Sequence, residues 1–276
     1  MKPLHTLLGV LLVLGLVSGP AFAADIPPDA KGAKAALEKS PRHGEWADIK
    51  VPGMEKPMPA YVVYPESKEK APVVIVIMEI FGLSDWIRSV TDQLAAEGFI
   101  AIAPDLIAGK GPGGTGSEAL KSQDDAPPLV RGLKPEEVVA RLNATREYGK
   151  SLPAANGKTA TVGFCWGGGS SFMYATAQPE LNAAVVFYGA APQADALSKI
   201  KAPVLGNYGE NDARINATID ATKKEMSRLG KPYTVHIYPG AGHGFMRQQD
   251  GQNGANAKAT QQAWPTTIAF LKEHTK

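Results

Sequence analysis

The sequence lacks cysteine pairs, clusters of metal ligands and runs of basic residues. Cys165 is its only cysteine, so the chain has no internal disulfide and no Cys-x-x-Cys redox pair. No group of histidine, cysteine, aspartate and glutamate has the spacing of metal ligands, and we expect neither a metal nor a cofactor. The formal net charge is only +2 and no basic run occurs, which argues against binding to nucleic acid or to an anionic membrane surface.

Long apolar runs are also scarce. The run at residues 7–17 is too short to span a bilayer. It follows Lys2 and precedes Ala21 and Ala23, which is the pattern of a secretory signal peptide over the first 23 residues. A membrane anchor or a buried N-terminal helix is the alternative. We therefore expect a protein exported to the periplasm or secreted, with a single, monomeric domain over residues 24–276 that does not contact the membrane after cleavage.

Short β-branched runs alternate with helical patterns, which predicts an α/β fold with a mostly parallel sheet and helices on both faces. We expect strands at residues 46–51, 58–64, 73–78, 99–103, 159–165, 183–189, 203–208 and 233–238. The first two read as an antiparallel hairpin at a sheet edge. We expect helices near residues 85–98, 135–152 and 215–229, and a final helix in which Pro265 marks a kink or a late start.

Two segments do not fit this alternation. Residues 24–44 are polar, with proline and lysine, and predict an irregular lead-in. Residues 106–133 are rich in glycine, proline, serine and aspartate, and a connection this long inside a compact domain is usually functional or mobile. We interpret it as a cap or gate over a site; the alternative is a solvated insertion without a role.

The most informative stretch is residues 159–169, where a β-branched run ends in Gly163-Phe164-Cys165-Trp166-Gly167 and small residues follow. Strand, sharp turn and helix with a reactive side chain at the turn form a nucleophile elbow, here with cysteine in place of serine. No Gly-x-Ser-x-Gly occurs elsewhere. The glycines are needed because a Cβ would crowd the neighbouring strand or helix. The alternative is a buried cysteine packed under a helix.

Catalytic residue types follow four of the expected strands: Glu79, Cys165, Asp212 and His243. The carboxyl ends of parallel strands meet at one edge of a sheet, where such folds place their chemistry. The order nucleophile, acid, histidine is that of the α/β-hydrolases. Cys165 would be the nucleophile, His243 would accept its proton, and Asp212 would orient the imidazole.

The N–H groups of Trp166 and Ile80 would form an oxyanion hole beside this nucleophile. Two of the acids have a plainer interpretation. Asp212 could only cap the helix expected from residue 215. Glu79 ends a buried strand, where a carboxylate is costly unless it is used or paired, and it could simply pair with an arginine of the scaffold.

Five motifs together resemble the dienelactone hydrolase (carboxymethylenebutenolidase-like) family over nearly all of the expected mature chain. They are Glu79-Ile80-Phe81-Gly82, Pro104-Asp105-Leu106, Gly163-Phe164-Cys165-Trp166-Gly167-Gly168, Gly209-x-x-Asp212 and Gly242-His243-Gly244-Phe245. The resemblance implies an α/β-hydrolase core without a large separate cap. It also implies hydrolysis of an enol lactone or a related small ester through a thioester acyl-enzyme.

The resemblance further implies roles for three charged residues. In the family a glutamate contacts the resting thiol and takes its proton when substrate binds, and Glu79 is the matching position. The family also anchors a substrate carboxylate with arginines. Arg247, four residues after His243, matches one of them, and Arg131 is the candidate for the other.

Two other functions remain open at this stage. A small-molecule binding protein that kept this fold without turnover is the main alternative, because fold alone does not give function. A thiol redox protein is disfavoured, because no second cysteine is present to resolve an oxidised Cys165.

Overall fold

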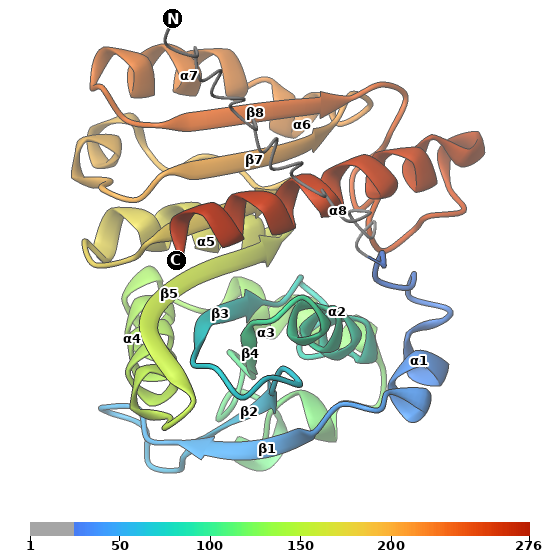
Figure 1. Ribbon diagram of the computed structural model, residues 1–276, viewed down its shortest axis with the longest axis vertical. Coiled ribbons are helices and arrows are strands. Elements are labelled where there is room, and N and C mark those ends of the chain that lie inside the picture. Colours follow the sequence, from blue (N-terminus) through green and yellow to red (C-terminus); the bar gives the residue numbers. More distant parts are fainter. Residues whose placement is uncertain (1–24) are drawn as a thin grey trace, which may run out of the picture.

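The computed structural model describes residues 25–276, so the expected signal peptide lies outside the described residues. Eight strands form one sheet. They are β1 (Gly44–Ile49), β2 (Met58–Val63), β3 (Ala71–Ile77), β4 (Ile100–Pro104), β5 (Ala155–Phe164), β6 (Ala183–Phe187), β7 (Val204–Gly209) and β8 (Tyr233–Tyr238). Their spatial order is β1-β2-β4-β3-β5-β6-β7-β8 (Figure 1).

Strand direction divides the sheet into a small antiparallel part and a large parallel part. β2 pairs antiparallel with β1 and with β4, whereas every pair from β4 through β8 is parallel. The central strands β4 and β6 are fully buried, as continuous apolar runs covered on both faces require. The predicted α/β-hydrolase fold and the hairpin at the sheet edge are therefore confirmed.

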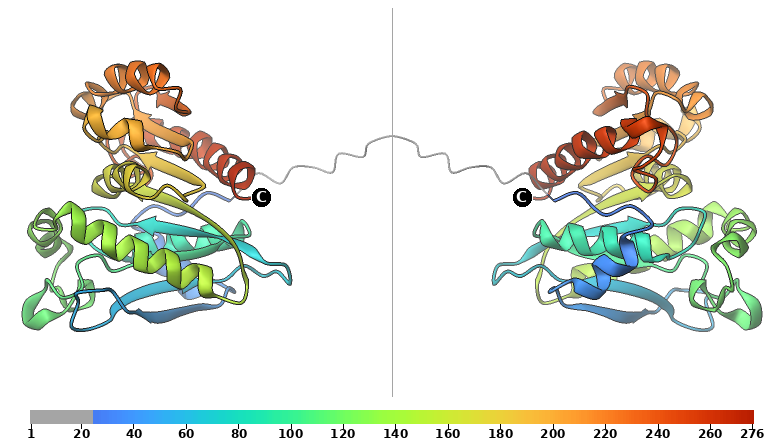
Figure 2. Two further views of the ribbon diagram at one scale, coloured as in Figure 1. Left: turned by 90° about the vertical axis from the view of Figure 1, so that its left-hand side faces the viewer. Right: turned by 90° about the vertical axis from the view of Figure 1, so that its right-hand side faces the viewer.

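Helices cover both faces of the sheet. They are α1 (Ala33–Lys39), α2 (Asp85–Ala96), α3 (Ala126–Arg131), α4 (Pro135–Ser151), α5 (Trp166–Ala177), α6 (Ala213–Asn216), α7 (Ile219–Arg228) and α8 (Ala255–His274). Figure 2 shows α2 and α8 on one face and α4 and α5 on the other. None of the helices in the described part of the chain is long and apolar enough to cross a bilayer.

Two predictions about helices were wrong. The lead-in at residues 24–44 is not irregular throughout, because Ala33–Lys39 forms α1, whose helix-favouring residues pack against α2. The helix expected at residues 215–229 is divided into α6 and α7. The Asn216 side chain at the end of α6 donates from Nδ2 to the carbonyl of Gly209 at 2.8 Å, which ties this turn to the end of β7.

The long connection after β4 folds into the short helical turns η1 (Pro112–Gly114), η2 (Ser117–Ala119) and η3 (Gln123–Asp125), followed by α3. Buried Asp105 fastens it to the sheet. Its carboxylate accepts hydrogen bonds from the Ser117 backbone N–H at 2.6 Å and the Ser117 hydroxyl at 2.7 Å. The same hydroxyl accepts from the backbone N–H of Leu83 at 2.9 Å. The connection is thus held in place at Ser117, near its middle. Its role as a cap or gate over the site stays a prediction.

Candidate active site

Cys165 occupies the sharp turn between β5 and α5. Its backbone has φ 54° and ψ −115°, a strained conformation for a residue other than glycine. A Cβ on Gly163 would lie 1.9 Å from the carbonyl oxygen of Gly167, and one on Gly167 would lie 2.3 Å from that of Ile77. The prediction that both positions must be glycine is confirmed, and close packing holds the thiol above the end of the sheet.

The three residues predicted as a triad are in contact. His243 Nε2 lies 3.0 Å from the sulfur of Cys165, and His243 Nδ1 lies 2.5 Å from Oδ2 of Asp212. Asp212 stands at the N-cap position of α6, but its side chain makes no capping hydrogen bond. The carboxylate therefore serves His243 rather than the helix, and the imidazole is held with its other nitrogen toward the thiol.

The surroundings of Cys165 keep its thiol protonated. The pKa of Cys165 is raised to about 11. Burial is the largest cause, and the negative charge of Glu79 contributes to the same rise. The backbone N–H of Trp166 and the charge of Arg214 act in the opposite direction, because both stabilise a thiolate. At neutral pH the free thiolate is thus scarce, and a nucleophilic Cys165 needs a base in contact with it.

Glu79 lies near the thiol but has a different partner. Its carboxylate is 3% exposed and lies 2.8 Å from Nε of Arg247. Burial raises the pKa of Glu79 to about 7, against the lowering effects of Arg247 and of the Tyr188 hydroxyl. No hydrogen bond joins Glu79 to Cys165 among the described residues, so the resting contact implied by the family resemblance is absent from this conformation.

Arg247, predicted to anchor a substrate carboxylate, contacts two residues of the protein itself. Besides its ion pair with Glu79, its guanidinium stacks over the ring of Phe81 at 4.6 Å. Arg247 does not line the pocket beside Cys165. The contacts with Glu79 and Phe81 hold this arginine outside the lining of the pocket, and its binding of a substrate carboxylate stays a prediction.

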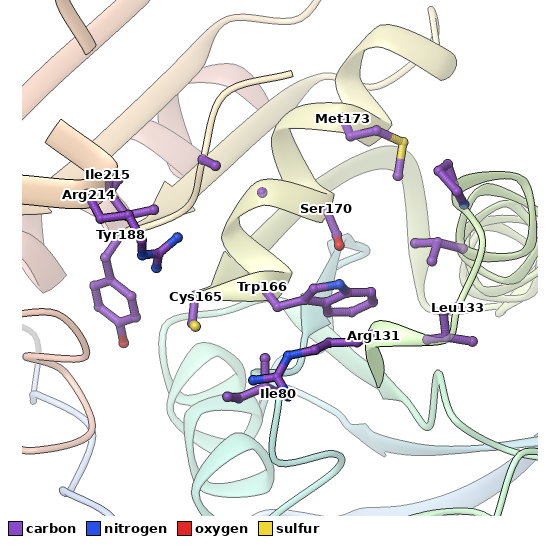
Figure 3. Close-up of a pocket in the computed structure, with 14 residues that line it drawn as sticks. Ile80, Arg131, Leu133, Cys165, Trp166, Ser170, Met173, Tyr188, Arg214 and Ile215 are labelled. Carbon is purple, nitrogen blue, oxygen red and sulfur yellow. The ribbon is translucent and has the colours of Figure 1, made fainter. Parts of the chain in front are cut away.

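A pocket of about 600 Å³ opens beside Cys165 (Figure 3). Its walls are mostly apolar and include Ile80, Leu133, Val138, Trp166, Met173 and Ile215. Arg131 lines it, as the family resemblance suggested, and brings the end of the long connection after β4 into the wall. Arg214 also lines it. Sequence reasoning missed Arg214, although its position two residues after Asp212 was a usable signal.

Tyr188 is a second residue that sequence reasoning missed. It follows β6, has φ 39°, is fully buried and lines the pocket. Its ring lies 5.1 Å from the imidazole of His243, and its hydroxyl has no well-oriented hydrogen-bond partner among residues 25–276. Such strain in a bulky residue is typical of functional sites. No sequence signal marked it, because a tyrosine at the end of a buried strand is ordinary.

The two residues predicted for the oxyanion hole lie next to the thiol. The backbone N–H of Trp166 at the start of α5 faces the sulfur of Cys165 closely enough to lower the pKa of the thiol. Ile80, three residues after β3, lines the same pocket. The site thus combines a thiol, an imidazole in contact with a carboxylate, a backbone N–H at a helix N-terminus and a cavity for a small molecule.

Comparison with known proteins agrees with this arrangement. The family model of the dienelactone hydrolase family matches residues 58–275. A Salmonella typhimurium protein with the provisional name carboxymethylenebutenolidase is 30% identical over 81% of this chain and 86% of its own length. A protein of Methylorubrum extorquens with the same provisional name is 32% identical over 82% of this chain and 80% of its own.

Solved structures give the same result. A provisionally named dienelactone hydrolase from Klebsiella pneumoniae superposes with a TM-score of 0.72 at 27% identity, covering 84% of this chain and 99% of that one. A dienelactone hydrolase-like promiscuous phosphotriesterase from metagenomic libraries shares the fold, with a TM-score of 0.69 at 22% identity over 85% of this chain and 99% of that one. The chain therefore belongs to the dienelactone hydrolase family and is a hydrolase with an α/β-hydrolase fold.

Proposed function

We propose that this enzyme hydrolyses small esters or lactones through a thioester on Cys165, with His243 as general base and acid and Asp212 as its orienting partner. One observation carries the proposal: the continuous contact from Asp212 through His243 to the sulfur, at 2.5 Å and 3.0 Å, beside an open pocket. The provisional names of the relatives favour an enol lactone as the substrate type.

In acylation the thiol of Cys165 gives its proton to Nε2 of His243. Because the pKa of Cys165 is about 11, this transfer accompanies the attack of sulfur on the substrate carbonyl carbon. The carbonyl oxygen gains negative charge, which the N–H groups of Trp166 and Ile80 stabilise. When the tetrahedral intermediate collapses, the carbon–oxygen bond breaks and the departing oxygen takes the proton from His243. In a lactone this oxygen remains attached to the acyl group.

Deacylation uses the same groups in reverse. His243 accepts a proton from a water molecule, whose oxygen attacks the thioester carbon. Collapse of the second intermediate breaks the carbon–sulfur bond, and the sulfur recovers its proton from His243. The free acid leaves. Asp212 stabilises the positive charge on the imidazole during both halves of the reaction.

Glu79 acts on this cycle mainly through its charge. In the observed conformation its carboxylate is paired with Arg247 and cannot take the proton of Cys165 directly. Its negative charge raises the pKa of the thiol, which keeps the resting sulfur protonated and less open to oxidation. A direct proton transfer to Glu79 would require the carboxylate to leave Arg247 first.

Substitution of Cys165 by alanine tests the proposal. Hydrolysis of 4-nitrophenyl acetate and of an enol lactone should fall by roughly 10⁴-fold or more, while the melting temperature and circular dichroism stay those of the wild type. Mass spectrometry of the intact wild-type protein, quenched during turnover, should show one acyl group on Cys165. Wild-type kcat in the Cys165→Ala variant would refute the mechanism, and binding without turnover by the wild type would favour a binding protein.

A further inference from the structure

The turn that follows β3, residues 78–84, carries one of the two N–H groups proposed for the oxyanion hole. Ile80 lines the pocket beside Cys165 (Figure 3), and its backbone N–H donates to no backbone carbonyl within the described chain. A donor stabilises an oxyanion well only when it is already in position as the charge develops. The contacts that hold this turn therefore bear on the reaction.

The turn supports itself only in part. Within it, the N–H of Gly82 donates to the carbonyl three residues earlier at 3.4 Å, and the N–H of Ser84 donates to the carbonyl two residues earlier at 2.9 Å. Ile80 faces the pocket beside the thiol, whereas Phe81 and Leu83 line a second pocket of about 360 Å³. Because both pockets border the turn, packing alone does not fix its position.

A chain of hydrogen bonds ties the turn to the end of β4. The backbone N–H of Leu83 donates to the hydroxyl of Ser117 at 2.9 Å, and this hydroxyl donates to the buried carboxylate of Asp105 at 2.7 Å. The same carboxylate accepts from the backbone N–H of Ser117 at 2.6 Å. A hydroxyl that donates to a charged acceptor is itself a stronger acceptor, so the two bonds reinforce each other.

Two glycines allow the three segments to meet. A Cβ on Gly116 would lie 2.1 Å from Oδ2 of Asp105, and a Cβ on Gly82 would lie 2.7 Å from Oγ of Ser117. Gly82 also has φ 75°, a conformation that glycine adopts without strain. The backbones of the connection and of the turn thus approach each other more closely than larger residues would permit.

We propose that Ser117 is a positioning residue for the oxyanion hole and that Asp105 acts through it. The Ser117 hydroxyl fixes the N–H of Leu83, and with it the turn, so that the N–H of Ile80 points to the substrate oxygen. The long connection after β4 then contributes to catalysis by holding this turn. The inference rests on the proposed function and adds two residues that do not touch the substrate.

Two substrates that differ in one atom test the inference. They are 4-nitrophenyl butanoate and its thiono analogue, in which sulfur replaces the carbonyl oxygen. Sulfur is a weak hydrogen-bond acceptor, so attack on the thionoester depends little on the oxyanion donors. For both substrates, kcat/KM for release of 4-nitrophenol reports on acylation. The measured quantity is the ester value divided by the thionoester value, and the same ratio for 2-mercaptoethanol is the reference for a free thiol.

The variants are Ser117→Ala, Asp105→Asn and both together, with Ser89→Ala as the matched control. Ser89 is a buried serine whose hydroxyl donates within α2, to the carbonyl of Trp86 at 2.8 Å. The wild-type ratio should exceed that of the free thiol. It should fall by roughly 10- to 100-fold in each single variant, because a displaced donor stabilises the oxyanion less. The double variant should fall no further, since both residues act through one chain of bonds. Ser89→Ala should keep the wild-type ratio.

Hydrogen exchange gives a readout that does not depend on turnover. Peptides that span residues 78–84 should exchange faster in Ser117→Ala than in the wild type, and at the wild-type rate in Ser89→Ala. If Asp105→Asn fails to fold, Ser117→Ala alone decides, because it removes a single hydroxyl from a half-buried residue of the connection.

Any of four results would overturn the inference: a wild-type ratio no higher than that of the free thiol, an unchanged ratio or unchanged exchange in Ser117→Ala, a further fall in the double variant, or the same fall in Ser89→Ala. An equal loss with both substrates leaves the ratio unchanged and shows a purely structural role. Failure of the proposed function gives a different result, because hydrolysis would then survive Cys165→Ala. The ratio would still report on the donors, since it does not depend on which group attacks the carbonyl.

Discussion

Two carboxylates flank Cys165, and each is paired with a nitrogen base of a different kind. Asp212 holds His243 at 2.5 Å, and His243 in turn reaches the sulfur at 3.0 Å. Glu79 holds Arg247 at 2.8 Å, and this pair is directed toward Phe81. An imidazole can accept and release a proton near neutral pH, whereas a guanidinium cannot.

Under the mechanism that we propose, this difference in partner gives two similar acids different roles. Asp212 acts on the thiol through a group that carries protons. Glu79 acts on it only through space, by raising the pKa of Cys165. We therefore expect the partner of each carboxylate to decide whether that carboxylate takes part in proton transfer.

The largest expected effect separates the two acids by rate. Asp212→Asn should lower kcat for a neutral ester by roughly 10³- to 10⁴-fold, because the imidazole loses the partner that fixes its tautomer and stabilises its charge. Glu79→Gln, the matched amide on the other side, should lower kcat less than about tenfold. Steady-state kinetics of both variants provide the measurement. A loss of 10²- to 10⁴-fold in acylation by Glu79→Gln would show instead that Glu79 accepts the thiol proton.

A smaller effect is expected in the rate at which the Cys165 thiol is alkylated in the enzyme without substrate. Since the pKa of Cys165 is about 11, alkylation by iodoacetamide should keep rising with pH up to that region. Glu79→Gln removes a negative charge that raises this pKa, so alkylation at pH 8 should become faster than in the wild type. The unfolded wild-type chain serves as the control for an unshielded thiol. A wild-type rate that is constant above pH 7 would mean that a thiolate and a protonated His243 coexist at rest.

The sequence predicted those parts of the site that depend on strand order and backbone sterics. Parallel strands bring their carboxyl ends together, so placing Glu79, Cys165, Asp212 and His243 at one edge required only correct strand assignments. The elbow followed from glycine spacing, because the contacts of Gly163 are made by backbone atoms that any sequence with this fold would have.

Side-chain partners were less predictable, because they depend on rotamers and on packing between distant segments. Arg247 has the right spacing from His243 for a substrate anchor, yet its long side chain turns to Glu79 and Phe81. Arg214 looked like an ordinary residue of a helix start until α6 placed it beside the pocket. The positive φ of Tyr188, the residue directly after β6, has no marker in the local sequence.

The last expected effect is on the free energy of unfolding and tests whether charged Glu79 destabilises the folded protein. Its pKa in the folded protein is about 7, above the ordinary 4.5, because burial outweighs the pairing with Arg247. Between these values the folded state binds more protons than the unfolded state, so the contribution of Glu79 to stability is lost as pH rises.

The Glu79→Gln variant has no such titration. We therefore compare the free energy of unfolding of the wild type with that of the variant. The wild-type value minus the variant value should fall between pH 4.5 and 7, by at most about 3 kcal/mol. Tyr188→Phe removes a hydroxyl that lowers the pKa of Glu79 and should extend the fall to higher pH. Urea unfolding of the three proteins at pH 5, 6, 7 and 8 measures both effects. A difference that stays constant over this range would mean that Glu79 is ionised throughout, and that its attraction to Arg247 compensates fully for its burial.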